Sequence, residues 1–246
     1  MPGRKTVLVT GATGGIGKAL ALQLLAAGHR VIAAGRSETE LGQLAAAGAE
    51  TIQADFRHSR DTDRLLASLP VLDAVVFGAG IGFFQYAETQ AEEEMRDTFE
   101  VNVLSVMTMT GHLLKTNPGI HLIYIASLAG KVATPKASVY AASKHALLGY
   151  ASAVRMETEG RAVVTVVNTG PVDTGFLDLA DTTGRYRQSA GRFLLKPETV
   201  ARKIVSVLEQ PVREVNLPRL SGAGAKLHQL LPRLSERFGR RFFDKK

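Results

Sequence analysis

Short runs of apolar and β-branched residues alternate with longer segments in which apolar residues recur every three or four positions. The first pattern predicts strands and the second predicts helices. The predicted strands are 6–10, 30–34, 50–53, 73–77, 120–126 and 162–168, with a short edge strand near 213–217. The predicted helices lie near 15–27, 38–46, 59–68, 92–115, 138–159 and 197–209.

This regular alternation of strand and helix is typical of an α/β protein. It predicts a single Rossmann-like domain, a doubly wound parallel sheet with helices on both faces in a three-layer α/β/α arrangement. Ligands of such sheets bind at the carboxyl ends of the strands. The first candidate boundary is Leu217-Pro218, which separates a main domain of residues 1–217 from a tail of residues 218–246.

The composition narrows the class of protein. The chain has 246 residues, of which 45% are hydrophobic, so it can bury one sizeable core. It has no cysteine, which excludes disulfides and cysteine-bound metals, and His112 and His121 lack partners at metal-ligand spacing, so we expect no metal site. No apolar run reaches the roughly 18 residues of a membrane span, and the first residues lack the apolar stretch of a signal peptide. We expect a soluble, cytoplasmic protein.

The net charge of +7 resides almost entirely in the tail. From Arg219 onward there are eight Lys or Arg against Glu236 and Asp244, a net charge of +6, which leaves +1 for the remaining residues. Apolar residues recur there at helical spacing, with interruptions at Pro232 and Gly239, which predicts a basic amphipathic helix. Such a helix docks on its own domain or a partner subunit, or lies at an anionic membrane surface. Nucleic-acid binding is the weakest alternative, because the tail lacks an aromatic platform for bases, and we expect no nucleic-acid partner.

A glycine-rich turn lies between the first predicted strand and the first predicted helix. Glycines let the backbone approach a pyrophosphate, and the N–H groups at the helix start receive its charge. The turn therefore predicts a dinucleotide site, although a tight turn without a ligand is the plainer alternative. The residues expected to contact the dinucleotide here are Gly11, Thr13, Gly14, Gly15, Ile16 and Gly17.

A tyrosine and a lysine are placed for proton transfer. Tyr140 and Lys144 are four positions apart on a predicted helix, so their side chains share one face. A lysine ammonium near a phenol favours the phenolate and lowers the tyrosine pKa, which suits an acid that works near neutral pH. Such a pair also arises by chance, but Ser127 ends a predicted strand thirteen residues before Tyr140. The serine and the glycine turn together make the pattern specific.

These motifs resemble the classical branch of the short-chain dehydrogenase/reductase family over roughly residues 5–215. The residues that carry the resemblance are Thr10, Gly11, Gly15, Gly17, Ser127, Tyr140 and Lys144. The resemblance implies an oxidoreductase that interconverts a carbonyl compound, a ketone or aldehyde, and an alcohol with a nicotinamide cofactor. It implies that Tyr140 donates the proton, Ser127 binds the carbonyl oxygen, Lys144 holds the ribose hydroxyls, and Asn102 anchors a water that relays protons to Lys144.

The resemblance also assigns the rest of the cofactor site. Gly35 stands where NAD-binding members carry an aspartate, and Arg36 with Ser37 suits a 2′-phosphate, so we expect NADP(H). Asp55 is expected to accept from the adenine amino group, with the N–H of Phe56 beside the ring.

Two segments depart from the family's pattern. Phe77, Gly78, Ala79 and Gly80 end the fourth strand where the family usually carries Asn-Asn-Ala-Gly. Gly78, Ala79 and Gly80 are still small enough to admit the ribose, but the amide hydrogen bonds with which the two asparagines brace the sheet are lost, which bears on local rigidity more than on catalysis. Pro171, Val172 and Thr174 are expected to orient the nicotinamide carboxamide, with Thr169 in place of a proline.

The substrate loop is expected at residues 175–196. This loop contains both apolar residues and arginines. In one interpretation the apolar residues enclose an apolar substrate and the arginines bind an anion; in the other the segment is a mobile loop whose arginines are solvated. The apolar ones are Phe176, Leu177, Leu179, Tyr186, Phe193 and Leu194, and the arginines are Arg185, Arg187 and Arg192.

The resemblance further implies a homodimer, because helices 92–115 and 138–159 resemble those with which the family forms a two-fold interface. From a different class of function, the alternative is an NADP-binding regulator or scaffold with little turnover. The intact Ser127, Tyr140 and Lys144 argue against it, since a sensor needs only the glycine turn.

Overall fold

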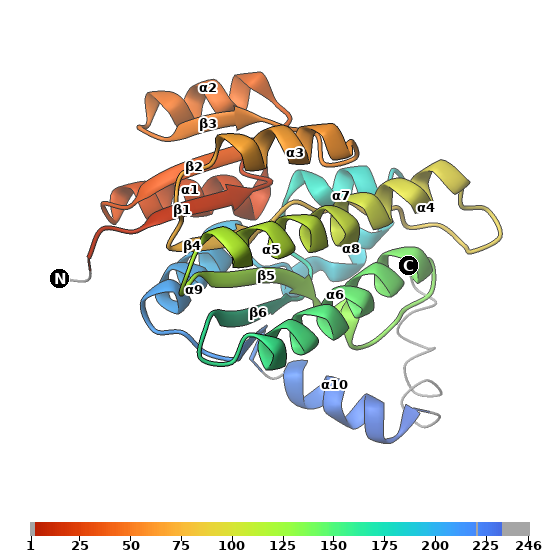
Figure 1. Ribbon diagram of the computed structural model, residues 1–246. Coiled ribbons are helices and arrows are strands. Elements are labelled where there is room, and N and C mark those ends of the chain that lie inside the picture. Colours follow the sequence, from red (N-terminus) through yellow and green to blue (C-terminus); the bar gives the residue numbers. More distant parts are fainter. Residues whose placement is uncertain (1–2, 220, 233–246) are drawn as a thin grey trace.

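The computed structural model describes residues 3–219 and 221–232, apart from the side chains of Arg192, Ala223 and Gln229. Seven strands form one parallel sheet in the order β3-β2-β1-β4-β5-β6-β7 (Figure 1). The strands are β1 Thr6–Thr10, β2 Arg30–Gly35, β3 Glu50–Gln53, β4 Ala74–Phe77, β5 His121–Ser127, β6 Val163–Thr169 and β7 Glu214–Leu217. The direction of winding reverses between β1 and β4, which opens a crevice at their carboxyl ends.

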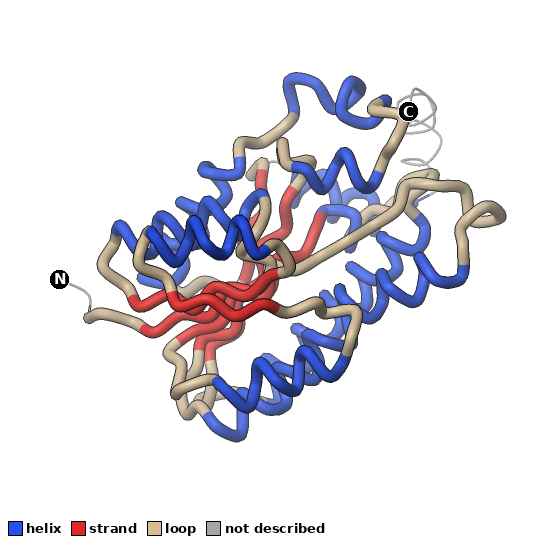
Figure 2. Tube along the Cα trace, turned by 90° about the horizontal axis from the view of Figure 1, so that it is seen from above, coloured by secondary structure: helices blue, strands red, loops and turns tan. Residues whose placement is uncertain are grey.

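Helices cover both faces of the sheet, which confirms the doubly wound, three-layer fold (Figure 2). Helices α1 (Gly15–Ala26), α2 (Glu38–Ala46) and α9 (Pro197–Glu209) pack on one face, and α3 (Ser59–Ser68), α5 (Ser105–Thr116) and α6 (Ser138–Glu157) pack on the other. Alternate strand residues point to opposite faces. Val7 and Val9 therefore join the core under α1 and α9, whereas Leu8 between them joins the core under α5 and α6.

The helix predicted over 92–115 is divided into three pieces. It consists of α4 (Glu92–Phe99), a π-helical turn (Glu100–Leu104) and α5. A π-helical turn inside an α-helix inserts an extra residue and often marks a functional site. The hydrophobic periodicity runs through it without a break, so the sequence does not reveal the turn, which carries Asn102.

The segment predicted as a loop over 175–196 also contains helices. They are α7 (Gly175–Ala180), α8 (Arg185–Ala190) and a short 3-10 turn (Gly191–Phe193). Gly184 and Gly191 border α8 with φ values of 69° and 38°, a region that glycine adopts without steric cost. A further helix, α10 (Ser221–Leu230), follows β7.

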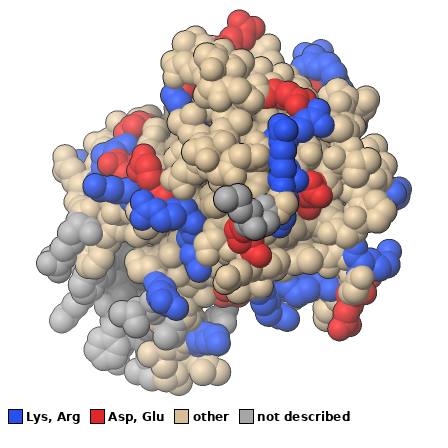
Figure 3. Space-filling model, turned by 90° about the vertical axis from the view of Figure 1, so that its left-hand side faces the viewer, with Lys and Arg blue, Asp and Glu red and all other residues tan. Residues whose placement is uncertain are grey.

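The charges of the described residues are interspersed on the face where β1 begins. Figure 3 shows Lys and Arg beside Asp and Glu there, in mixed groups. Arg30 pairs with Glu50 in this way, between the starts of β2 and β3. The basic part of the tail beyond Pro232 lies outside the described residues.

Candidate active site

A large cleft lies at the carboxyl ends of the strands. Its volume is about 1580 Å³, and its lining runs from the glycine turn at Gly11 to His228 in α10. Pockets for one drug-sized ligand have volumes of roughly 300–1,000 Å³. The cleft therefore has room for two ligands, a dinucleotide and a substrate.

The glycine turn forms the floor of one half of the cleft. A Cβ at Gly11, where φ is 68°, would lie 2.7 Å from the backbone nitrogen of Ala79, and a Cβ at Gly17 would overlap the carbonyl oxygen of Gly11. Gly14, the N-cap of α1, has no atom within 4 Å of its Cβ position and leaves open space. The first turn of α1 holds no acidic residue and no side-chain cap, so its N–H groups are available to an anion. The turn fits a dinucleotide pyrophosphate.

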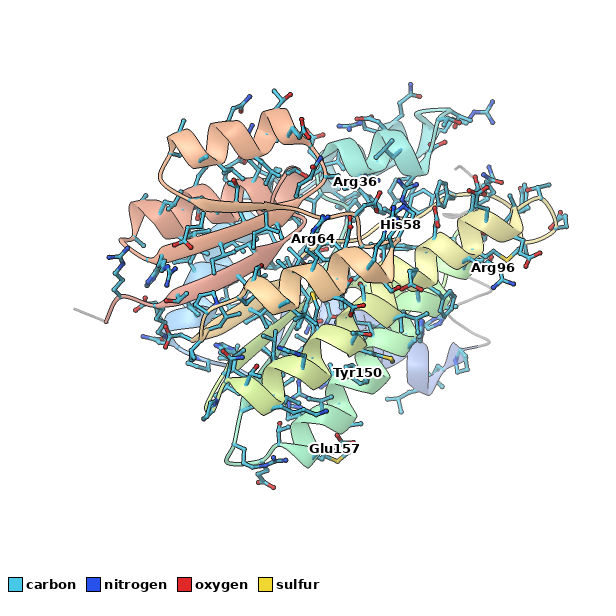
Figure 4. The ribbon with its side chains drawn as sticks, turned by 45° about the horizontal axis from the view of Figure 1, so that its top comes forward. Arg36, His58, Arg64, Arg96, Tyr150 and Glu157 are labelled. Atoms are coloured by element: carbon cyan, nitrogen blue, oxygen red, sulfur yellow. The ribbon has the colours of Figure 1, made fainter. Side chains whose placement is uncertain are left out.

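The end of β2 has no room for a side chain at Gly35. A Cβ there would lie 2.5 Å from the methyl carbon of Thr13, so an aspartate would have to displace the Thr13 side chain. Arg36 is the next residue, directly after the end of β2, and its exposed side chain lines the cleft (Figure 4). The Ser37 hydroxyl caps α2 by accepting from the N–H of Glu40 at 3.3 Å, and it can still donate its own proton.

After β3, Asp55 is held by an arginine that sequence reasoning missed. Arg57 donates to its carboxylate from Nε at 3.1 Å and from Nη2 at 2.6 Å, and lies 3.5 Å from Asp97. The hydrogen bonds from Arg57 lower the pKa of Asp55 and keep it ionised. Phe56 is buried in the core, so only its backbone is positioned to meet a ring. The end of the cleft where adenine is expected therefore holds an Arg57–Asp55 pair, whose sequence signal is an arginine two residues after the aspartate.

The segment after β4 is braced despite its missing asparagines. The Thr10 hydroxyl accepts from the N–H groups of Gly78 at 3.1 Å and Ala79 at 3.2 Å. A Cβ at Gly78 would lie 2.7 Å from the carbonyl oxygen of Thr10, so the two strand ends are in close contact. A hydroxyl from β1 therefore supplies hydrogen bonds to this segment where the asparagine amides are absent, and the effect on its rigidity stays a prediction.

Asn102 fastens the next residue of that segment. Its Oδ1 accepts from the N–H of Ile81 at 2.9 Å, and its Nδ2 donates to the Ile81 carbonyl at 2.8 Å and to Ser143 Oγ at 3.0 Å. Both amide hydrogens are thereby used. Oδ1 of Asn102 and Nζ of Lys144 lie 3.4 and 3.5 Å from the Cβ position of Gly80, so the amide and the ammonium flank one backbone site.

Ser127, Tyr140 and Lys144 meet beside this segment. Ser127 ends β5, where its hydroxyl accepts from the N–H of Ala129 at 3.1 Å and donates to the Thr169 carbonyl at 3.4 Å. Tyr140 lies in the first turn of α6, within hydrogen-bonding reach of Ser127. Lys144 is buried one turn later and donates to the Ile125 carbonyl at 3.2 Å.

The ionisation of this group differs from expectation. Burial raises the pKa of Tyr140 to about 12, and the Ser127 hydrogen bond opposes this only in part. Burial also lowers the pKa of Lys144 to about 8, because an ammonium loses its hydration there. The expected lowering of the Tyr140 pKa by Lys144 is therefore wrong for the protein alone, where burial outweighs the neighbouring amine.

The segment after β6 is fastened to residue 195. Pro171 accepts from the N–H of Leu195 at 2.9 Å, and the N–H of Asp173 donates to the Leu195 carbonyl at 2.9 Å, on either side of Val172. Thr174 contacts the glycine turn, since a Cβ at Gly15 would lie 2.6 Å from its methyl group. Pro171, Val172 and Thr174 all line the cleft.

The three arginines of residues 175–196 differ in their surroundings. Arg187 forms ion pairs with Asp173 and Asp178 and donates to the Thr174 carbonyl at 3.0 Å. The Arg187 guanidinium is therefore already paired with carboxylates of this chain. It is neither an isolated surface arginine nor open to pair with an anionic substrate. Arg185 lines the cleft, and the side chain of Arg192 is outside the description.

Helix α10 places part of the tail at the cleft. Gly222 packs on β7, since a Cβ there would lie 2.8 Å from Asn216 Nδ2. The residues of α10 that line the cleft are Ser221, Gly224, Ala225 and His228. Among the described residues, no helix is long and apolar enough to cross a membrane, and no cluster of three His, Asp or Glu is placed to bind a metal.

Comparisons with known proteins point to one family. The family model described as short chain dehydrogenase matches residues 5–183. The uncharacterized oxidoreductase YbbO of Escherichia coli is 28% identical, over 93% of this chain and 91% of its own length. The ketoacyl reductase HetN of Nostoc is 31% identical, over 86% of this chain and 77% of its own. The closed form of a serine dehydrogenase complexed with NADP+ superposes with a TM-score of 0.79 at 27% identity, covering 86% and 93% of the two chains.

Proposed function

The chain belongs to the short-chain dehydrogenase family of oxidoreductases, and from this premise we propose that it reduces a ketone or aldehyde to an alcohol, reversibly, with NADP(H). The observation that carries the proposal is the convergence of Ser127, Tyr140 and Lys144 at one end of the cleft. A dinucleotide-binding protein without turnover has no use for these three groups together.

The proposed reaction divides its tasks among them. When bound, the nicotinamide ring supplies the hydride in reduction and accepts it in oxidation. The Tyr140 hydroxyl donates its proton to the carbonyl oxygen, and Ser127 Oγ donates a hydrogen bond to the same oxygen, which stabilises its developing charge. The raised pKa keeps Tyr140 protonated at neutral pH, ready to donate. Lys144, with a pKa of about 8, then returns a proton to the phenolate, and we assign to Asn102 the anchoring of a water that resupplies Lys144.

The same proposal assigns the cofactor. Gly11, Thr13, Gly14, Gly15, Ile16 and Gly17 hold the pyrophosphate. Arg36 and Ser37 bind the 2′-phosphate of NADP(H), which is supported by the lack of space for a carboxylate at Gly35. Asp55 binds the adenine amino group through the lone pairs that Arg57 leaves, and the serine dehydrogenase relative is complexed with NADP+.

We also propose a homodimer through α4, α5 and α6. Leu104 in the π-helical turn before α5 is 49% exposed, and Met156 on α6 is 73% exposed. Apolar residues that a partner subunit covers are exposed in this way when one chain is considered alone. The tail lies at the substrate mouth through α10, and contact with a membrane remains the alternative for its basic end. Light scattering of the full chain tests this assembly, and a monomer at micromolar concentration contradicts it. A cytoplasmic location stays a prediction.

A screen of NADPH oxidation against aldehydes and ketones tests the proposed function. We expect turnover with at least one carbonyl compound, and a loss of roughly 10²- to 10⁴-fold after Tyr140→Phe. Tight NADPH binding without turnover on any of them overturns the proposal and favours the regulatory alternative.

A further inference from the structure

The ring of Tyr140 is enclosed by segments from outside its own helix. A Cβ at Gly82 would lie 2.6 Å from Cδ2 of Tyr140, so the segment after β4 lies directly against the ring. The Phe84 ring meets it edge-on with centroids 6.0 Å apart, and the Phe176 ring is tilted against it at 5.5 Å. The hydroxyl of Tyr140 reaches Ser127, while these contacts place aromatic and backbone carbon against its ring.

Phe84 is the centre of this group. Its ring lies 6.3 Å from that of Phe176 in α7 and 4.9 Å from that of Tyr186 in α8. Its backbone N–H donates to the carbonyl of Ala180 at 2.7 Å, which fixes α7 against the segment after β4. We refer to Phe84, Phe176 and Tyr186 as the aromatic corner. All three line the cleft.

Two charged groups near the aromatic corner, Asp181 and Arg187, are already bonded within the protein. The Asp181 carboxylate accepts from the N–H groups of Tyr186 at 2.7 Å and Thr183 at 3.0 Å, and Arg187 is paired with Asp173 and Asp178. Further apolar side chains that line the cleft include Leu128, Val132, Leu179 and Ala190. Two cations, Lys136 and Arg185, also line it, and Lys136 lies over the Tyr86 ring at 5.2 Å. The groups packed directly on the Tyr140 ring are thus largely apolar, which favours an apolar ligand beside it.

We propose that the substrate carries an apolar arm, an alkyl chain or an aromatic ring, attached to its carbonyl group, and that this arm packs in the aromatic corner. The inference rests on the proposed reduction at Tyr140 and adds the class of substrate. Burial of one methylene stabilises by about 0.8 kcal/mol, or about fourfold in kcat/KM. Aromatic rings gain further from edge-to-face contact.

A chain-length series of ketones tests this substrate class. With saturating NADPH, kcat/KM is measured for 2-butanone through 2-decanone, for acetophenone and for hydroxyacetone. We expect a rise of about fourfold for each added methylene until the corner is filled, with hydroxyacetone the poorest. Turnover that is flat with length, or best with hydroxyacetone, overturns the apolar arm and leaves the proposed function standing. Absence of turnover with every carbonyl compound overturns the proposed function itself.

Substitutions in the aromatic corner test whether the apolar arm of the substrate packs there. Phe84→Leu and Phe176→Leu remove corner rings. Tyr86→Leu is the matched control within the same cleft, since Tyr86 also lines it but is 54% exposed and its ring meets Lys136 instead of the aromatic corner. We expect both corner variants to lose about tenfold in kcat/KM for 2-decanone, equal to about 1.4 kcal/mol, and little for 2-butanone, with the control unchanged. An equal loss for both ketones, or the same loss in the control, overturns the assignment.

Calorimetry of the native protein needs no variant. We titrate 2-decanone into the protein saturated with NADP+, at several temperatures. Burial of an apolar arm gives a negative heat-capacity change on binding. A heat-capacity change of zero overturns the proposal.

Discussion

Lys144 and Tyr140 lie one turn apart on α6, with the Lys144 ammonium nitrogen 5.8 Å from the centre of the Tyr140 ring. The hydrogen bond of this ammonium goes to the Ile125 carbonyl. Burial raises the pKa of Tyr140 to about 12 and lowers that of Lys144 to about 8, so at pH 7 the phenol is protonated and the lysine still carries its proton. The proton to be transferred to the substrate therefore resides on the Tyr140 phenol. Lys144 is placed to return a proton to Tyr140 after that transfer.

Removal of the Tyr140 hydroxyl tests this order. We expect Tyr140→Phe to reduce kcat roughly 10²- to 10⁴-fold, the usual contribution of a general acid, and to change NADPH affinity only a few-fold. The matched control is Tyr150→Phe on the same helix, whose hydroxyl donates to the Met107 carbonyl outside the cleft. Steady-state kinetics and titration of cofactor fluorescence measure both. Substantial activity in Tyr140→Phe removes this residue from the mechanism.

Arg36 is expected to determine the choice of cofactor. NADPH should bind at least tenfold more tightly than NADH, a difference of about 1.4 kcal/mol, because the guanidinium pairs with the 2′-phosphate. Arg36→Ala should abolish most of this difference by weakening NADPH alone. Arg96→Ala is the control, since Arg96 is exposed on α4 and paired with Glu92 (Figure 4). Equal affinities in the unaltered protein disprove the role of Arg36.

Local patterns were enough to predict the sheet and the cleft. The strands, the glycine turn and the Tyr140–Lys144 spacing each depend on neighbours in the chain, and the seven-stranded sheet was predicted down to its edge strand. The roles within the cleft remain proposals.

Contacts between distant segments were not predictable in the same way. Thr10 replaces the missing asparagines only because β1 and β4 end side by side, and the aromatic corner joins a loop to two short helices. The balance between burial and charge at Tyr140 is also a property of the packed site. Spacing alone indicated a lowered pKa, whereas the surrounding rings raise it.

Arg187 is expected to hold the predicted substrate loop, residues 175–196, against the segment that follows β6. It joins Asp178 of α7 to Asp173 and to the carbonyl of Thr174. We expect Arg187→Ala to raise KM for substrate several-fold and to speed amide hydrogen exchange in this loop. Exposed ion pairs contribute little to stability, so the melting temperature should change little. Arg187→Lys keeps the charge without the planar fork and should be intermediate. Unchanged exchange in Arg187→Ala contradicts the role.

His121 is expected to make the fold sensitive to acid. It is 5% exposed in β5, and its Nε2 lies 2.9 Å from Thr165 Oγ1, which itself donates to the Val212 carbonyl at 2.6 Å. Thr165 therefore accepts from a neutral imidazole. Burial, with a smaller effect from the charge of Lys5, lowers the pKa of His121 to about 4.

The sign follows from proton uptake. Between pH 6.5 and about 4 the unfolded chain binds a proton at His121 that the folded chain does not, so the free energy of unfolding falls as the pH falls through this window. The full shift corresponds to roughly 3 kcal/mol. Urea unfolding at pH 7, 6, 5 and 4 should therefore give His121→Gln a shallower decline than the unaltered protein. His112→Gln, at an exposed position on α5, should decline like the unaltered protein. Parallel declines for all three proteins would show that His121 is not the residue that titrates.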